Sequence, residues 1–98
     1  MPRENKKPKV SFIMPAFNAG HTIANAITSI LNQSEKDWEL IIINDGSTDN
    51  TKKRIEQFND SRIRTYHFIK NRGLVEARNN GSELAVADIL AVQDADDL

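Results

Sequence analysis

The stretch Leu40-Ile41-Ile42-Ile43-Asn44-Asp45-Gly46-Ser47 decides the fold of this chain. Its first four residues are all apolar, and a strand without polar alternation is typical of a parallel sheet that is covered on both faces. The last four residues are typical of a turn, and Ser47 or Thr48 could cap a helix that follows. Asp49 would then lie in the first turn of that helix, where its charge suits the positive end of the helix dipole. The stretch therefore predicts a buried strand with Asp45 at its carboxyl end.

Three more strands are predicted around this one. Val10–Met14 is a short apolar run that Pro15 is expected to end, because proline has no N–H for the ladder. Ile63–Ile69 is rich in β-forming residues and, because it also carries an arginine and a histidine, is expected at an edge of the sheet. Asp88–Val92 is the fourth strand.

Apolar residues at helical spacing predict three helices between the strands. These residues are Ile23, Ala26, Ile27, Ile30 and Leu31 in the first helix, Ile55 and Phe58 in the second, and Leu74, Ala77, Gly81, Leu84 and Ala85 in the third. Strands and helices thus alternate along the chain, and short right-handed crossovers then require parallel strands. We expect an α/β fold, a Rossmann-like and mostly parallel sheet with helices on both faces.

Composition narrows the class of protein. The chain has 98 residues, of which 39% are hydrophobic and 28% are charged, as in a single globular domain. Its formal net charge of -1 gives no electrostatic reason to expect a nucleic-acid partner. The absence of cysteine excludes disulfides, zinc–thiolate sites and thiol nucleophiles.

Residues 1–9 are polar and basic, and no apolar signal-peptide segment follows them. We expect them to form a flexible lead-in and residues 10–98 to form the folded domain. No apolar run approaches the roughly 20 residues of a membrane span. We therefore expect a cytoplasmic protein, while the basic cluster Arg3, Lys6, Lys7 and Lys9 leaves contact with the inner face of a membrane open.

In sheets of this kind, ligands bind beyond the carboxyl ends of the strands. Three polar groups are expected at that edge: Pro15–Asn18 after the first strand, Asp45 after the second and Asp94–Asp97 after the fourth. In extended backbone, Asp94 and Asp96 lie on one face, where their carboxylates can hold one divalent cation. Phosphate oxygens usually fill the remaining positions of such a cation. The pattern favours a metal-assisted phosphate or nucleotide-sugar site, and the alternative is a solvated acidic segment.

Four residues at this edge each have two interpretations. Phe17 can stack on a nucleobase or pack under the next helix. Asn18 can bond a ligand or cap that helix. Asp45 can accept the imide N–H of a uracil or hold the backbone of its own turn. Arg78, on the apolar side of the third helix, can meet a diphosphate or a strand-end aspartate, or extend along the sheet edge to solvent.

The two histidines, His21 and His67, have no partners at metal-ligand spacing, and we interpret them as structural.

Five segments together resemble family 2 glycosyltransferases. The first, Val10–Asn18, is similar to the family's opening strand, which usually ends Pro-x-Tyr-Asn and here has Phe17 in place of the tyrosine. The others are Ala26–Ser34, which resembles the first helix, Glu39–Asp49 with the Asp-Gly-Ser-x-Asp turn, Asn71–Leu74 followed by Ala77–Asn79, and Gln93–Asp97, which resembles the metal-binding Asp-x-Asp. The match runs through essentially all of residues 9–98 and keeps the family's order.

The resemblance implies a GT-A fold, of which this is the amino-terminal half with strand order 3-2-1-4, and a nucleotide-diphosphate sugar donor, most often a UDP-sugar. The implied donor-binding residues are Pro15, Ala16, Phe17, Asn18, Asp45, Arg78 and Asp94. Phe17 keeps the aromatic ring that stacks on the base but lacks the hydroxyl of tyrosine. Asp94 would face the ribose or the metal, and Asp96 would coordinate Mn²⁺ or Mg²⁺ on the diphosphate.

The resemblance also implies what the chain lacks. Members of this kind invert the anomeric centre with a carboxylate base downstream of the Asp-x-Asp, so no catalytic residue is assigned within residues 1–98. We expect a truncated amino-terminal half that does not transfer sugar alone, with the saccharide or lipid-linked acceptor bound by the missing half in polysaccharide or glycoconjugate synthesis. The alternative is a non-catalytic nucleotide-binding module. An open apolar edge at Ile89–Val92 would favour self-association.

Overall fold

The computed structural model describes residues 7–95. Its elements are β1 (Val10–Ala16), α1 (Ile23–Asn32), β2 (Trp38–Asp45), α2 (Thr51–Glu56), β3 (Ile63–Phe68), α3 (Leu74–Leu84) and β4 (Ile89–Val92). The predicted alternation of strands and helices is confirmed. Within the described residues no helix is long and apolar enough to span a membrane.

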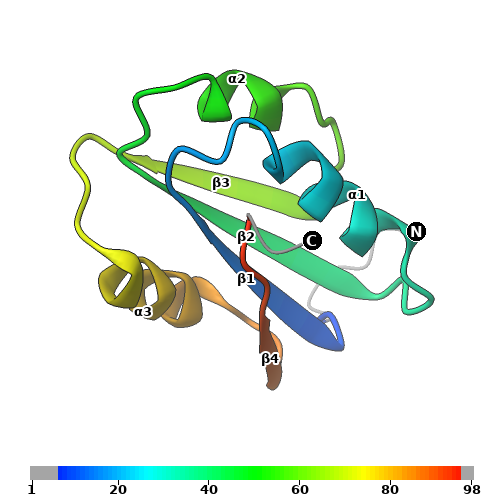
Figure 1. Ribbon diagram of the computed structural model, residues 1–98. Coiled ribbons are helices and arrows are strands. Elements are labelled where there is room, and N and C mark those ends of the chain that lie inside the picture. Colours follow the sequence, from blue (N-terminus) through cyan, green and yellow to red (C-terminus); the bar gives the residue numbers. More distant parts are fainter. Residues whose placement is uncertain (1–6, 96–98) are drawn as a thin grey trace.

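The four strands form one parallel sheet in the order β3-β2-β1-β4. Helices α1 and α2 lie on one face and α3 lies on the other (Figure 1). The predicted α/β fold with helices on both faces is therefore confirmed, as is the strand order that the family resemblance implied.

Strand β2 is the centre of the core, and all eight of its residues are buried. Successive side chains of a strand point to opposite faces. Leu40 and Ile42 accordingly pack with α1 and α2, while Ile41 and Ile43 pack with α3. This two-sided burial explains why the sequence of β2 has no polar alternation.

Strand β1 is longer than predicted, because Pro15 does not end it. Pro15 pairs in register with Ile43 of β2, and Ala16 is the last residue of the strand. The carbonyl of Ile13 accepts a hydrogen bond from Gln93 on the β4 side. Backbone groups alternate sides along a strand, so the missing N–H of Pro15 also faces that side, beyond the last β4 pair.

Helix α2 begins later than predicted. Its N-cap residue is Asn50, so neither Ser47 nor Thr48 caps it and Asp49 lies before its first turn. The Asp49 carboxylate instead accepts hydrogen bonds from the backbone N–H and hydroxyl of Thr51. The predicted apolar residue Phe58 lies beyond the end of this helix but still packs against the core.

Helix α3 lies close to the sheet at a glycine. Ala77 and Gly81 face the sheet and are buried, as predicted. Leu74 was predicted to share this apolar side, but it lies at the exposed start of the helix and is not buried. A Cβ on Gly81 would lie 2.5 Å from Cγ2 of Ile13 and 3.5 Å from Cγ1 of Ile43. The absence of a side chain at this position therefore sets how closely α3 approaches β1 and β2.

A buried carboxylate fixes the connection from α3 to β4. Glu39 Oε2 accepts hydrogen bonds from Ser11 Oγ at 2.5 Å and from the backbone N–H of Val86 at 2.8 Å. Its Oε1 accepts a hydrogen bond from Arg64 Nη2 at 2.8 Å, and Arg64 also donates to the carbonyl of Leu84. One side chain thus joins three strands to the end of α3.

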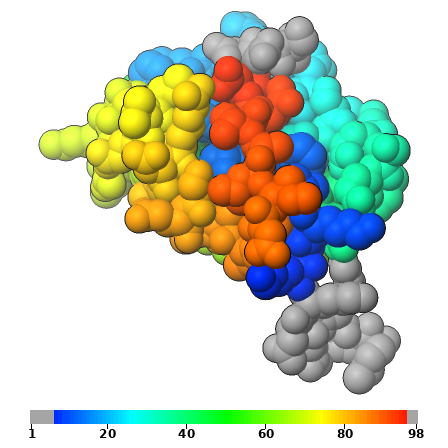
Figure 2. Space-filling model, turned by 90° about the horizontal axis from the view of Figure 1, so that it is seen from below, coloured from blue at the N-terminus to red at the C-terminus, as the bar shows by residue number. Residues whose placement is uncertain are grey.

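Strand β4 forms an open edge of the sheet. It pairs with β1 alone, and Ile89, Leu90 and Val92 are largely exposed. Figure 2 shows this strand on the surface beside α3. An exposed apolar edge strand favours pairing with another chain. Self-association through this edge stays a prediction.

Replacing Glu39 with glutamine should destabilise the fold most strongly at neutral pH. Burial raises the pKa of Glu39, but the hydrogen bonds from Ser11, Val86 and Arg64 outweigh it and hold the pKa below its ordinary value. This group therefore contributes stability above the ordinary glutamate pKa and loses it as the pH falls through the lowered pKa. We expect E39Q to lower the free energy of unfolding by about 1–3 kcal/mol at pH 7.

Urea unfolding of wild type and variant at several pH values measures this difference, which should shrink below about pH 4. The matched control is E83Q, which changes an exposed glutamate of α3. A difference between wild type and E39Q that stays constant across the acid range would contradict the assignment.

Replacing Gly81 with alanine should also destabilise the fold. Overpacking against Ile13 costs about 1–3 kcal/mol, while alanine gains about 1 kcal/mol of helix propensity. We expect a net loss of up to about 2 kcal/mol in urea unfolding, against a change within about 0.5 kcal/mol for S82A at the neighbouring exposed position. A G81A protein more stable than wild type would show that α3 can move away from the sheet.

Candidate functional site

Two loops at the carboxyl edge of the sheet are joined by the side chain of Asn18. This residue follows β1 and has a positive φ of 49°. Its backbone N–H donates to Ser47 Oγ at 3.0 Å, and its Oδ1 accepts from the backbone N–H of Thr48 at 2.8 Å. The N-cap of α1 is Thr22, so the alternative in which Asn18 caps that helix is wrong.

The same two loops meet again just before α1. The carboxylate of Asp49 accepts the backbone N–H of Gly20 at 3.0 Å, and Thr51 Oγ1 accepts the backbone N–H of Ala19 at 2.9 Å. Burial raises the pKa of Asp49, but the hydrogen bonds it accepts from Thr51 and Gly20 lower the pKa by more, so the net shift is downward. The backbone from Asn18 to Gly20 is therefore held by side chains of the neighbouring loop.

Phe17 lies at the start of the first of these loops. Its side chain is 52% exposed, although the residues on the β1 side of it are buried. The alternative in which Phe17 packs under α1 is therefore not what the structure shows. An aromatic face at the end of β1 is open to a ligand.

Asp45, at the end of β2, holds the loop between β3 and α3. Its carboxylate is 2% exposed. Oδ1 accepts the backbone N–H of Arg72 at 2.7 Å, and Oδ2 accepts the backbone N–H of Gly73 at 2.9 Å and Nδ2 of Asn71 at 3.0 Å. The side chain thus anchors a distant loop in place of its own turn, and its predicted contact with a uracil stays a prediction.

Gly46 allows this contact between the loops. Its φ is +71°, and a Cβ there would lie 2.3 Å from the backbone nitrogen of Asn71. Each residue of the Asp-Gly pair therefore has its own structural role. The aspartate binds the β3–α3 loop, and the glycine leaves room for the backbone of that loop.

Arg78 and Asp94 face each other across α3 and the end of β4. Arg78 Nη2 lies 3.8 Å from Asp94 Oδ1, and both side chains are partly exposed. Among residues 7–95, Arg78 Nε and Asp94 Oδ1 are buried and have no hydrogen-bond partner. Buried polar atoms are normally paired, so these two have the capacity to bind a ligand. A carboxylate oxygen without a hydrogen bond suits a hard divalent cation, and a guanidinium N–H suits a phosphate.

The predicted second metal ligand, Asp96, lies outside the described residues. Within the described part of the chain there is no group of three or more His, Cys, Asp or Glu side chains that could hold a metal ion. Asp94 is therefore the one predicted metal ligand whose surroundings the structure describes, and metal binding at Asp94 stays a prediction.

The predicted residues Pro15 and Ala16 form the end of β1, where both are buried. They pair with Ile43 and Asn44 of β2, so they fix the backbone from which Phe17 projects. Asn71 and Arg72 were not singled out from the sequence as partners of Asp45. The only local signal for them is the Asn-Arg-Gly turn, which does not name its distant partner.

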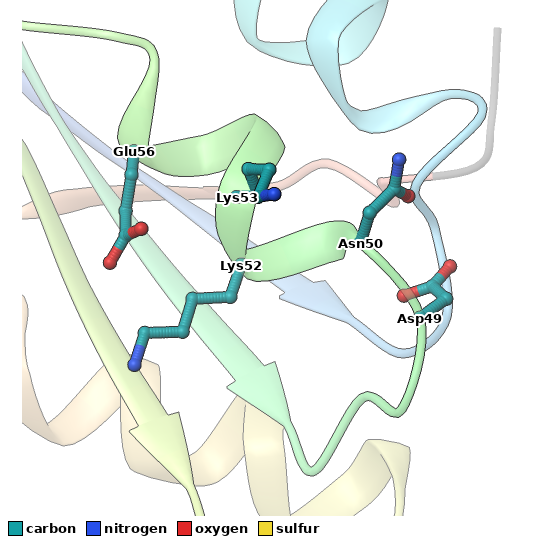
Figure 3. Close-up of a pocket in the computed structure, with 5 residues that line it drawn as sticks. All are labelled: Asp49, Asn50, Lys52, Lys53 and Glu56. Atoms are coloured by element: carbon teal, nitrogen blue, oxygen red, sulfur yellow. The ribbon is translucent and has the colours of Figure 1, made fainter.

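A hollow elsewhere on the surface is not the predicted site. Its lining residues are Asp49, Asn50, Lys52, Lys53 and Glu56, all from α2 and the residues just before it. Figure 3 shows Lys52 and Glu56 extending away from this short helix while Asn50 and Asp49 lie at its start. The side chains do not converge on one point, and we assign no binding site to the hollow.

Comparison with known proteins identifies the family of this chain. Residues 11–98 match the model of the glycosyl transferase family 2. The chain belongs to this family. The family resemblance read from the sequence is therefore confirmed.

Three similar proteins illustrate the family. The E. coli protein named UDP-Glc:alpha-D-GlcNAc-diphosphoundecaprenol beta-1,3-glucosyltransferase WfgD is 40% identical over 89 residues, which cover 91% of this chain and 35% of that protein. S. aureus TarS 1-349 has a TM-score of 0.81 at 25% identity, covering 91% of this chain and 28% of that one. The mannosyltransferase PcManGT of Pyrobaculum calidifontis, solved with GDP-Man and Mn²⁺, has a TM-score of 0.82 at 24% identity, covering 94% and 28%.

A further TarS structure, 24% identical and with a TM-score of 0.81 over 90% of this chain and 26% of that one, contains UDP-GlcNAc. These structural likenesses confirm the GT-A type of fold. The chain spans 35 to 38% of the length of the first curated relatives that it matches.

Replacing Asp45 with asparagine should loosen the β3–α3 loop. The amide keeps one acceptor oxygen, but its NH₂ group faces donors from Arg72, Gly73 or Asn71. We expect a loss of about 1–3 kcal/mol in the free energy of unfolding. We also expect hydrogen exchange at the backbone amides of Arg72 and Gly73 to accelerate by about tenfold or more.

Hydrogen exchange followed by NMR measures the change, with D88N at an exposed position as the control. Unchanged protection of the Arg72 and Gly73 amides in D45N would refute the role of this carboxylate as the anchor of the loop.

Proposed function

We propose that this chain binds the nucleotide-diphosphate part of a sugar donor, a UDP-sugar, at the carboxyl edge of its sheet, for metal-assisted transfer of the sugar to an acceptor hydroxyl. The observation that carries the proposal is the pair of buried polar atoms without a hydrogen bond among the described residues, Arg78 Nε and Asp94 Oδ1, at the edge where parallel sheets bind ligands. The family assignment gives that edge a substrate class.

The base and ribose part of the proposal rests on the end of β1. The half-exposed ring of Phe17 presents a face on which a nucleobase can stack, a contact that tolerates any base. Pro15, Ala16 and Asn18 fix the backbone on either side of that ring. Asp45 Oδ1 accepts one hydrogen bond from the chain, and its remaining lone pair could accept the imide N–H of a uracil.

The diphosphate part rests on Arg78 and on the two aspartates. The guanidinium of Arg78 offers N–H groups to phosphate oxygens, and Asp94 together with Asp96 would hold Mn²⁺ or Mg²⁺. The metal, when bound, supplies positive charge that stabilises the departing nucleoside diphosphate. Arg78, on α3, also supplies positive charge that stabilises the departing nucleoside diphosphate, and its ion pair with Asp94 keeps that carboxylate oriented.

The comparisons support the choice of donor and the kind of pathway. The name of the E. coli relative gives a UDP-Glc donor and a diphosphoundecaprenol-linked acceptor, and one TarS structure contains UDP-GlcNAc. The P. calidifontis enzyme contains GDP-Man with Mn²⁺. We therefore propose a UDP donor, a divalent cation, inversion at the anomeric carbon and a role in saccharide or glycoconjugate synthesis. No residue among 1–98 is proposed as the catalytic base.

Titration calorimetry of UDP into the chain tests the proposal. Binding with Mn²⁺ that is lost in EDTA, and that ADP and GDP do not reproduce, is the expected result. F17A should weaken UDP and uridine alike by about tenfold, because base stacking is worth about 1–3 kcal/mol. R78M should weaken UDP more than uridine, since uridine has no phosphate.

The control variant V75A removes apolar surface from an exposed position of α3 and should bind UDP as wild type does. If R78M lost affinity for UDP and for uridine by the same factor, Arg78 would not contact the diphosphate. No metal-dependent UDP binding by the folded chain would overturn the proposed donor site.

A further inference from the structure

A buried amide on β2 is held from two sides. Asn44 is 4% exposed and lies on the face of the sheet that α1 and α2 cover. Its Nδ2 lies 3.0 Å from Nδ1 of His67, its register partner on β3. Its Oδ1 accepts a hydrogen bond from Ser47 Oγ at 2.5 Å. The amide thus links an edge strand to the loop after β2.

The link continues to the loop that carries Phe17. Ser47 Oγ, which donates to Asn44, also accepts the backbone N–H of Asn18 at 3.0 Å. Asn18 has a positive φ, in the left-handed region that asparagine adopts more readily than most residues. A continuous set of hydrogen bonds therefore runs from the His67 ring to the backbone beside Phe17.

The protonation state of His67 follows from these partners. With the Asn44 amide in this orientation its NH₂ group donates, so the matching form of His67 is the neutral ring that accepts at Nδ1 and carries its proton on Nε2. Protonation would place an Nδ1–H against the NH₂ group. If the ring then turned away, the buried NH₂ would lose its acceptor. If the amide flipped, the Ser47 hydroxyl would lose the Asn44 oxygen.

The groups around His67 also favour the neutral ring. Burial lowers its pKa, Lys52 lowers it further, and Glu56 raises it by less, so the pKa lies below its ordinary value. Both charged residues come from α2, whose side chains extend from the helix as Figure 3 shows. The neighbouring strand β2 contributes the neutral Asn44, and α3 packs on the opposite face of the sheet.

We propose that Asn44, Ser47 and His67 are positioning residues that hold the Phe17–Asn18 turn in its nucleotide-binding form, and that protonation of His67 weakens this hold. The inference rests on the proposed nucleotide site but goes beyond it, because it makes donor affinity depend on pH through a residue outside the site. The neutral ring is the competent form, so affinity is full above the ordinary histidine pKa and falls as the pH drops through the lowered one.

The first test is the affinity for UDP-glucose with Mn²⁺ between about pH 5 and 8, a range in which this donor has no titrating phosphate monoester. The affinity of wild type for UDP-glucose should fall by about three- to tenfold at the acid end, which is the equivalent of one net hydrogen bond. H67N places an amide oxygen where Nδ1 lies, so it should bind as wild type does at neutral pH and show a flat profile.

S47A should weaken binding by about three- to tenfold at all pH values, since it removes the acceptor of Asn18. The control H21N changes the other histidine, which lies in the loop before α1, and should keep the wild-type profile. A pH dependence that persists in H67N, or that disappears in H21N, would overturn the proposal.

The second test needs no donor and therefore separates this inference from the proposed function. In NMR spectra the backbone amides of Asn18 and Thr48 should shift with the His67 titration in wild type and H21N, and not in H67N. If UDP-glucose does not bind, the nucleotide site fails while this titration still reports on the hydrogen bonds. Asn18 and Thr48 amides that do not follow His67 in wild type would refute the link itself.

Discussion

Two buried carboxylates on β2 fix the position of α3, and the arrangement of the proposed site depends on them. Asp45 at the carboxyl end of the strand binds the backbone that leads into α3, and Glu39 near its amino end binds the backbone that leaves it. Gly81 lets the helix lie against the sheet between these anchors. Because removing a partner from a buried charge is costly, each anchor is strongly specified. The helix so fixed carries Arg78 to the side of Asp94.

On the opposite face of the sheet, apolar packing and hydrogen bonds between loops hold the helices in place. There α1 and α2 pack through apolar side chains, and the loops before them are joined by hydrogen bonds that the side chains of Asn18, Thr51 and Asp49 accept from backbone N–H groups. These side chains bond to the backbone and so stabilise the loops. The ring of Phe17 is instead exposed at the sheet edge. Rigid loops around one exposed ring are what a preorganised binding surface requires.

The aspartates near the strand ends have different roles in this fold. Asp45, Asp49 and Asp94 all follow or lie near strand ends, yet the first two accept several hydrogen bonds from the chain and the third keeps a buried oxygen without one. The sequence places Asp45 and Asp94 at the same edge of the sheet and Asp49 at the start of the helix that follows. The numbers of hydrogen bonds that they accept differ because each carboxylate meets a different neighbouring segment. A ligand can bond only to the oxygen lone pairs that the chain leaves unused.

The sequence by itself determined the order and type of the elements, because apolar periodicity reports locally on which faces of a strand or helix are buried. It placed β2 at the centre and β3 at an edge, and it indicated the family through its motifs. The lengths of β1 and α2 were decided by tertiary contacts: the N–H that Pro15 lacks would have faced a side without a partner, and Asp49 binds Thr51 and Gly20 before the helix begins. The partners of Asp45 lie 26 to 28 residues away. Only the folded chain brings such residues together, because sequence periodicity carries no information about which distant loop a side chain will meet.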